Sequence, residues 1–205
     1  MKKQIILLLI LSVLMQIFFD VSVDKFEIVK QFIEDQLGTY YVQDFIEYNK
    51  KLSWVNYALL PIALFLRVLI IALVLNVGFY LTKIELPYKT ILKIVVKAEY
   101  VFLLAILIKM IWFNYFIDNY GIEYLQNFYP FSGLNITGYH INPIYIYPLK
   151  KINLFEVAYC FLIGYFVSKE SNIGFSNGLI TTTLSYGSAL ALWVLFFMFS
   201  FINNN

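Results

Sequence analysis

The sequence is poor in the residues that build metal and redox sites, and it is poor in charge. Its 205 residues include one cysteine, Cys160, and one histidine, His140. A single cysteine excludes an internal disulfide and a cysteine-based metal cage, and a single histidine argues against a histidine-rich metal site. We therefore predict no metal and no cofactor. The formal net charge of +2 is too small to indicate nucleic acid binding.

Apolar residues dominate instead. They make up 61% of the chain against 14% charged residues, with a mean hydropathy of +0.74, whereas soluble domains average about 25% charged residues. Five apolar stretches approach the roughly 20 residues that cross a bilayer. These stretches are residues 4–19, 55–81, 91–113, 152–167 and 179–202. The sequence predicts an all-α polytopic membrane bundle with five transmembrane helices and short amphipathic extracytoplasmic helices.

The chain divides into two predicted parts. Residues 1–53 combine a first apolar helix with an amphipathic segment, and residues 54–205 hold four further helices and an outer loop, 114–151. Met-Lys-Lys before an apolar run is typical of a signal peptide, but no A-x-A-like cleavage site follows, so we interpret the run as an uncleaved signal anchor. Frequent Ile, Asn, Lys, Tyr and Phe indicate an AT-rich, bacterial genome, and hence the bacterial inner (cytoplasmic) membrane.

The lysines barely distinguish the two sides of the membrane. With the N-terminus inside, Lys2 and Lys3 are cytoplasmic together with the lysines of residues 83–97, whereas Lys150 and Lys151 lie outside. Most acidic residues also fall outside, although acids contribute little to orientation. We expect a cytoplasmic N-terminus and an extracytoplasmic C-terminus.

Two outer segments are too polar to span the membrane. In residues 21–53, apolar residues recur at helical spacing between Asp24, a possible N-cap, and Gly38, a possible C-cap. These apolar residues are Phe26, Val29, Ile33, Leu37 and Tyr40. Loop 114–151 is rich in tyrosine, which favours the membrane interface. Each segment is predicted to lie along the bilayer surface or over the bundle, with a docking face for a partner as the alternative.

The pattern Gly-Phe-Ser-Asn-Gly at 174–178 matches a G-x-S-x-G nucleophile elbow. That elbow needs a strand before it, a helix after it and a histidine base within reach. The predicted topology puts His140 across the membrane from Ser176. We therefore expect the glycines to begin the last helix, and we predict that the chain is not an enzyme.

Arg67, the one arginine, lies in the middle of a predicted span, PIALFLRVLIIALVLNVGFYL at 61–81. A charge inside the membrane requires a partner or a water-filled cavity. A helix rises about 1.5 Å per residue, which brings Arg67 and Glu99 to similar depths, and Glu156 is reached from the outer side at a similar depth. We predict an intramembrane ion pair of Arg67 with Glu99, Glu156 or both. A structural clamp is the favoured role, and a ligand site is the alternative.

Lysines on the third apolar stretch form a basic cytoplasmic stripe. Lys89, Lys93 and Lys97 fall four residues apart on one helix face, and Lys83 lies in the loop before them. We expect these side chains to extend to the lipid headgroups. The alternative is that they hold anionic lipid or an acidic partner segment.

Small residues predict where helices pack closely. Cys160 and Gly164 share a helix face with Glu156, so Glu156 should face protein and not lipid. The last stretch repeats the small-xxx-small pattern. Its members are Ser185 with Ala189, and Gly187 with Ala191.

Three stretches carry a family resemblance: AEYVFLLAIL at 98–107, YPLKKINLFEVAYCFLIGYFV at 147–167, and SYGSALALWVLFFMF at 185–199. In pattern they resemble the YIP1 (Yip1-domain) family of five-span membrane proteins, over a little more than half of the chain. The resemblance implies a cytosolic N-terminus and a C-terminus on the far side. The chain lacks the D-L-Y-G-P motif and the long cytosolic N-terminal region of eukaryotic members, so their small-GTPase partners do not transfer to it.

These observations favour a non-enzymatic integral membrane subunit or scaffold of a bacterial envelope complex, for instance one in peptide or protein export. We expect its partners to be membrane lipids and other membrane-protein subunits, and not nucleic acid. A small-molecule or lipid transporter is the first alternative, although no inverted repeat is detectable. A lipid-acting membrane enzyme is the second, because Arg67, Glu99 and Glu156 could surround a headgroup.

Overall fold

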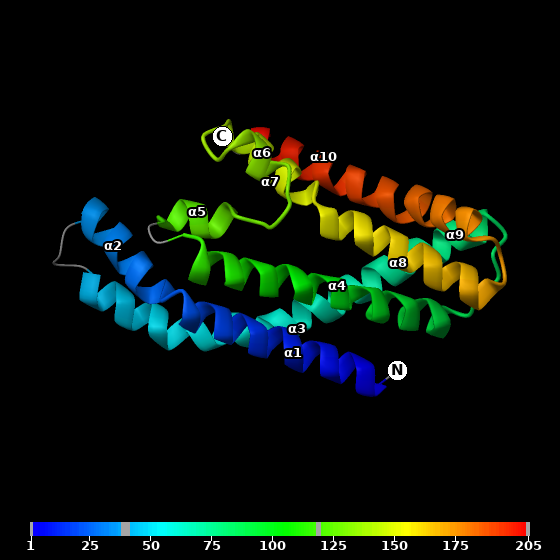
Figure 1. Ribbon diagram of the computed structural model, residues 1–205, viewed down its shortest axis with the longest axis horizontal. Coiled ribbons are helices and arrows are strands. Elements are labelled where there is room, and N and C mark those ends of the chain that lie inside the picture. Colours follow the sequence, from blue (N-terminus) through cyan, green and yellow to red (C-terminus); the bar gives the residue numbers. More distant parts are fainter. Residues whose placement is uncertain (1, 38–41, 118–119, 204–205) are drawn as a thin grey trace.

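Every regular element is helical in the computed structural model, which describes residues 2–37, 42–117 and 120–203. The long helices are α1 (Lys2–Ser22), α3 (Val42–Leu81), α4 (Tyr88–Tyr115) and α8 (Leu154–Ser171), followed by a last segment of α9 (Phe175–Thr182), η1 (Thr183–Gly187) and α10 (Ser188–Asn203). These segments run alternately in opposite directions along the molecule (Figure 1). The predicted all-α class is confirmed.

Three helical segments in the described part of the chain are long and apolar enough to cross a membrane: Lys2–Ser22, Trp54–Leu81 and Phe175–Asn203. They coincide with three of the five predicted spans. α4 and α8 correspond to the other two, and both bury many side chains against neighbouring helices. A helix that is apolar on all sides can be buried within the protein or can contact lipid. The membrane spans at α4 and α8 therefore stay predictions.

Helix α3 is longer than a span requires. Its 40 residues correspond to about 60 Å at 1.5 Å per residue, about twice the ~30 Å thickness of a bilayer core. The predicted boundary between residues 53 and 54 therefore falls inside a continuous helix. Pro61 also lies inside it, where the missing N–H removes one backbone hydrogen bond.

Helix α4 is the central element of the bundle, because it packs against α1, α3 and α8. The residues of α4 at the centre of this packing are all but fully buried, among them Ile91, Val95 and Ala98. On the opposite walls of the same core lie Leu75 from α3 and Ile163 from α8. Glu99 of α4 and Tyr159 of α8 are buried among these apolar side chains.

The outer segments contain short helices: α2 (Lys25–Leu37), α5 (Ile122–Asn127), α6 (Leu134–Thr137) and α7 (Pro143–Lys151). Asp24 precedes α2 as predicted, with its carbonyl accepting from the N–H groups of Glu27 and Ile28. The predicted C-cap Gly38 and the neighbouring Tyr40 lie outside the described residues. Loop 114–151 covers the ends of α1 and α4 with an aromatic cluster whose buried members include Phe19, Phe113 and Phe128.

A buried acid, Asp20, ties α1 to α3 near this end. Asp20 is 8% exposed and accepts hydrogen bonds from Tyr57 Oη at 2.9 Å and from Gln16 Nε2 at 3.0 Å. Lys25 lies 3.6 Å from the same carboxylate. Asp20 thus forms a fixed contact between α1 and α3.

The last segment begins as predicted, with Gly174 at the N-cap of α9. Between α9 and α10 the chain makes one π turn, η1. A π turn holds one residue more than an α turn, and such turns recur at functional sites. In this protein the π turn carries Tyr186, whose ring is buried in the core.

Candidate functional site

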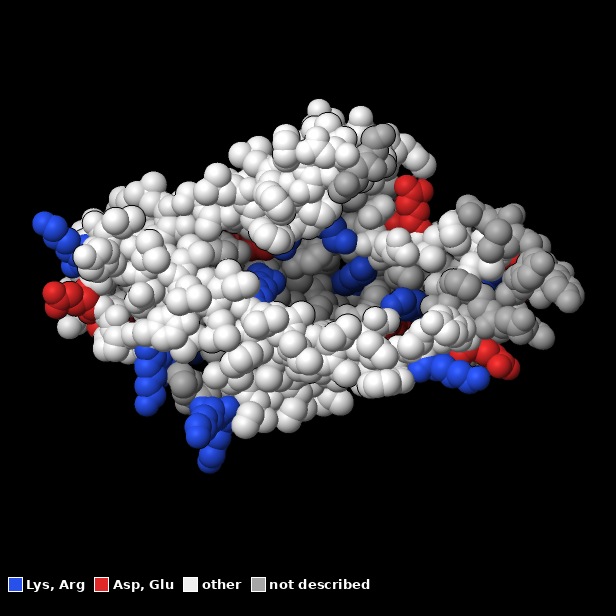
Figure 2. Space-filling view, turned by 180° about the vertical axis from the view of Figure 1, so that it is seen from behind, with Lys and Arg blue, Asp and Glu red and all other residues white. Residues whose placement is uncertain are grey.

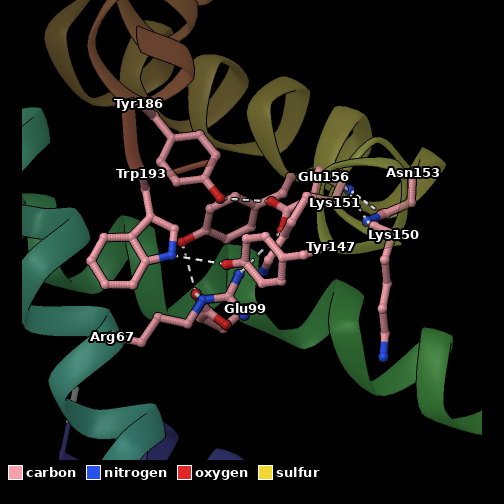
Figure 3. A network of polar contacts seen from close by, with 10 residues as sticks. Arg67, Glu99, Tyr147, Lys150, Lys151, Asn153, Glu156, Tyr186 and Trp193 are labelled. Atoms are coloured by element: carbon pink, nitrogen blue, oxygen red, sulfur yellow. Dashed lines mark hydrogen bonds and ion pairs between the residues drawn. The ribbon is translucent and has the colours of Figure 1, made fainter. Parts of the chain in front are cut away.

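Arg67, Glu99 and Glu156 come together inside the bundle, from α3, α4 and α8 (Figure 3). Arg67 Nε lies 3.5 Å from Glu99 Oε1, and Arg67 Nη2 lies 3.9 Å from Glu156 Oε1. Glu99 is only 1% exposed. The structure thus brings together the three residues for which depth along the helices predicted a pairing, and the single guanidinium contacts both carboxylates.

Each carboxylate also accepts a hydrogen bond from a buried tyrosine. The Tyr159 hydroxyl donates to Glu99 Oε1 over 2.9 Å, and the Tyr186 hydroxyl donates to Glu156 Oε2 over 2.6 Å. Such bonds to ionised acceptors are among the stronger ones in proteins, and they offset part of the cost of burying charge. Glu99 Oε2 is buried and has no hydrogen-bond partner in the described part of the chain.

Local sequence sets the position of Glu156. Asn153 caps α8, because its Oδ1 accepts from the Glu156 N–H over 2.8 Å. Asn-x-x-Glu has the spacing of a capping box, yet the Glu156 side chain points into the core towards Tyr186 (Figure 3). The first turn of a helix also stabilises a negative charge. Tyr159 follows Glu156 by three residues and so lies on the same face of α8.

Two further groups enclose the guanidinium and its partners. Lys151 Nζ, at the end of α7, lies 3.4 Å from Glu156 Oε1. The Phe102 ring of α4 has its centroid 4.2 Å from Arg67 Cζ, a cation–π geometry that suits a guanidinium with little hydration. Two cations therefore face two carboxylates, and the network links α3, α4, α7, α8 and η1.

Sequence reasoning missed Tyr159, Tyr186 and Lys151. The sequence did contain a signal for Tyr159. It follows Glu156 by three residues, so the two side chains share one helix face. The contact of Tyr186 depends on the π turn, which no spacing rule anticipates. Lys151 stands outside the predicted spans and was therefore treated only as a charge that reports orientation.

A cavity of about 190 Å³ adjoins the network. Its lining comprises Arg67, Phe102, Tyr129, Tyr147, Lys150, Lys151, Asn153 and Glu156. Figure 2 shows Lys and Arg side chains gathered around a hollow near the centre of the drawn face. In the described part of the chain, no three His, Cys, Asp or Glu side chains come together as a metal site would require.

The predicted basic stripe is dispersed along the surface. Lys93 Nζ lies 3.8 Å from Glu170 Oε1 of α8, and Lys97 Nζ lies 5.1 Å from the centroid of the Phe166 ring. Lys83 and Lys89 are exposed. Two of the four lysines thus contact α8, and the cytoplasmic role of the stripe stays a prediction.

Close helix contacts lie where two of the predicted small residues stand. A Cβ on Gly164 would come within 2.8 Å of Leu179 Cα, and one on Gly178 within 2.6 Å of the Gly164 carbonyl oxygen. Ser185 packs so tightly against Gly78 of α3 that a Cβ on that glycine would overlap its side chain. Gly78 and Gly178 are the partners that sequence reasoning missed.

Gly187 is a correction to the predicted packing. Among the described residues, a Cβ there would meet only Thr183 Cγ2, at 3.6 Å, so no helix in that part of the chain requires a glycine at this position. The prediction assumed α-helical spacing through residues 183–191, whereas the π turn adds a residue and shifts the face of each side chain. Cys160 and Ala189 are half-buried, and Ala191 is exposed.

Known proteins offer no relative from which to transfer a role for these residues. No family model, no curated protein and no solved structure matches the chain.

Proposed function

We propose that this protein is a non-enzymatic integral membrane subunit or scaffold of a bacterial envelope complex. In this proposal it crosses the inner (cytoplasmic) membrane five times, with a cytoplasmic N-terminus and an extracytoplasmic C-terminus. The observation that carries the proposal is an apolar groove of about 580 Å³ between α3 and the η1–α10 segment. We infer that the groove holds an apolar transmembrane helix of a partner protein.

The walls of the groove suit a helix. Leu73, Val77 and Leu81 line it from α3, and Leu192 lines it from α10. Small residues lie on both walls, where they allow close approach of another backbone. They are Gly78, Ser185, Ser188 and Ala189.

The polar atoms of these walls are already satisfied. Ser185 Oγ donates to the Thr181 carbonyl oxygen, and Ser188 Oγ donates to that of Leu184. The groove therefore presents an apolar surface with no hydroxyl proton left for a polar ligand. An apolar helix covers such a surface without leaving a buried donor unpaired.

Helix α10 adds exposed area beside the groove. Its apolar residues have no buried member among those described. Trp193, Phe196 and Phe199 are each more than half exposed. The buried network also supports a scaffold role. It links α3 and η1, the two walls of the groove, and so holds them at a fixed separation.

The resemblance to the YIP1 family supports the proposed orientation of the termini, but it supplies no partner. The departures from the eukaryotic pattern leave GTPase binding without support. We therefore define the partner by its chemistry, as a membrane protein with a helix of apolar and small residues.

A photo-crosslinking amino acid at Val77 tests this proposal in intact cells. Val77 lies in the groove, and Tyr165 on α8 is a matched control that is also exposed but lies outside it. We expect one membrane protein to be crosslinked at Val77 and not at Tyr165. Ala189→Phe, which fills the groove, should abolish the adduct, whereas Ala191→Phe, on an exposed position, should leave it. Lipid adducts alone, or a protein adduct insensitive to Ala189→Phe, would refute the proposal.

A further inference from the structure

The cavity beside the buried network contains more positive than negative charge. Arg67, Lys150 and Lys151 line it, with Glu156 as the one carboxylate in its wall. Glu99, on the far side of Arg67, compensates the charge of that guanidinium. Counted over the part of the chain that the structure describes, three cations face two carboxylates, which leaves one positive charge without a counter-ion in a partly enclosed space. Charge of this kind is stabilised by an anion.

Among the described residues, Lys150 has no carboxylate within ion-pair distance. Its side chain points away from Glu99 and Glu156 (Figure 3), and its Nζ donates to the Gln126 carbonyl oxygen over 2.7 Å. An ammonium group has three donors, so two remain. Burial, and then the neighbouring charge of Lys151, lower the pKa of Lys150. A bound anion would relieve this repulsion.

Donors on the other walls also have free capacity. Arg67 reaches its carboxylates over 3.5 and 3.9 Å, beyond the roughly 2.7–2.9 Å of a charge-assisted hydrogen bond, so the guanidinium can still serve an acceptor. The Tyr147 hydroxyl accepts from Trp193 Nε1 over 2.8 Å and keeps its own proton to donate (Figure 3). Asn153 is different, because its Oδ1 accepts from the Glu156 N–H and its Nδ2 donates to the Lys150 and Lys151 carbonyl oxygens at the end of α7.

The size of the cavity limits what it can hold. Its volume of about 190 Å³ is several times the ~30 Å³ that a water molecule occupies in the liquid. It is smaller than the ~300–1,000 Å³ of pockets for whole small molecules. One tetrahedral oxyanion with a few waters fits these limits, and it offers several acceptor oxygens for the Arg, Lys and Tyr donors in the wall.

We propose that this cavity binds a phosphate group, held by Arg67, Lys150 and Lys151 with the Tyr147 hydroxyl as a further donor. The proposal goes beyond the partner groove, which also has α3 as a wall but shares no lining residue with this cavity. Either proposal can therefore fail without the other.

A second cavity indicates how the phosphate is carried. It has a volume of about 310 Å³, lies between α1, α3 and α4, and shares Arg67 and Phe102 with the first. Most of its wall is aliphatic, with Leu60, Leu64 and Ile106 among the lining residues, and Glu99 lines it beside Arg67. A phospholipid would place its phosphate on one side of Arg67 and an acyl chain on the other. Free phosphate would use the first cavity alone.

The test is a ligand titration of the purified full-length protein, followed by its thermal unfolding. The probes are dihexanoyl-phosphatidylglycerol, dihexanoylglycerol, which has the same chains without the phosphate, and inorganic phosphate. The variants are Lys150→Gln, which removes the unpaired cation and no ion pair, and Lys89→Gln, an exposed lysine on α4. Neither substitution touches the buried carboxylates, so both proteins should fold.

We expect phosphatidylglycerol to stabilise the wild type, and dihexanoylglycerol to do so far less. Lys150→Gln should weaken phosphatidylglycerol binding about tenfold, the worth of one hydrogen bond to a charged group, whereas Lys89→Gln should leave it unchanged. If inorganic phosphate binds as tightly and with the same dependence on Lys150, the phosphate site stands and its source is free phosphate. Equal binding of the two dihexanoyl lipids, or equal binding by the two variants, would overturn the proposal.

Discussion

The bundle carries lysines at both ends, and the two ends use them in opposite ways. Where α3 turns into α4, Lys83 and Lys89 are exposed and Lys93 makes an ion pair at the surface. At the other end, Lys150 and Lys151 join Arg67 around one cavity. Regular spacing along one helix spreads cations over a surface, whereas convergence of α3 and α7 encloses a volume. The difference shows that a site of this kind arises from topology and not from periodicity.

The two ends also differ in what holds the helices together. Near the lysine stripe, α8 and α9 meet through backbone contacts at Gly164 and Gly178. Near the cavity, the helices meet through the network of Arg67, Glu99 and Glu156. Backbone contacts depend on shape alone, while a buried network depends on every charge having its partner. Substitutions at the two ends should therefore differ in size and in whether a second change can compensate them.

The largest effect is expected for Arg67→Glu. It leaves three carboxylates together in the core, and breaking a buried ion pair costs about 3–5 kcal/mol. The amount of folded protein, measured by size-exclusion chromatography in detergent, should fall sharply. Adding Glu99→Arg or Glu156→Arg should restore part of it, because opposite charges again face each other.

The clamp assignment would be wrong if neither double variant regained folded yield while Arg67→Ala folded normally. In that case the network would not be a clamp, and Arg67 would serve a ligand alone. Lys93→Glu is the matched control at the other end, and it should leave the folded yield near that of the wild type.

An intermediate effect is expected for Gly164→Leu. The leucine would have to displace the Leu179 backbone, which lies 2.8 Å from the position of a Cβ, and overpacking of this kind costs about 1–3 kcal/mol. Thermal unfolding should show the loss. Gly187→Leu meets only Thr183 and should unfold near the wild-type temperature, so equal melting of the two variants would contradict the assigned packing.

The smallest effect is expected for Lys93→Gln. The ion pair with Glu170 is 3.8 Å long, with both side chains at least a third exposed, and surface pairs contribute about 0–1 kcal/mol. The same thermal measurement should detect little change at low salt and none at high salt. A loss as large as that of Gly164→Leu would show that the stripe is a structural site after all.

The sequence allowed the long helices and the grouping of Arg67, Glu99 and Glu156 to be predicted, and the reasons are physical. Long apolar runs can satisfy their backbone in a membrane only as helices, and the constant rise of a helix allowed the depths of Arg67 and Glu99 to be compared. The same reasoning failed where geometry departs from the ideal α-helix. The π turn moved Gly187 away from its expected contact and brought Tyr186 to Glu156. Gly78 escaped notice because its partner, Ser185, lies more than a hundred residues away.

The length of α3 has a consequence for how far the protein reaches. If the bilayer covers Trp54–Leu81, residues 42–53 continue the helix by about 18 Å at 1.5 Å per residue. That part of α3 packs with α2 (Figure 1), and in this placement the two helices would stand above the headgroups. Lipid cannot cover such a projection. Any contact made there is made through water, and it selects its partner by charge and hydrogen bonding instead of by fit within the membrane.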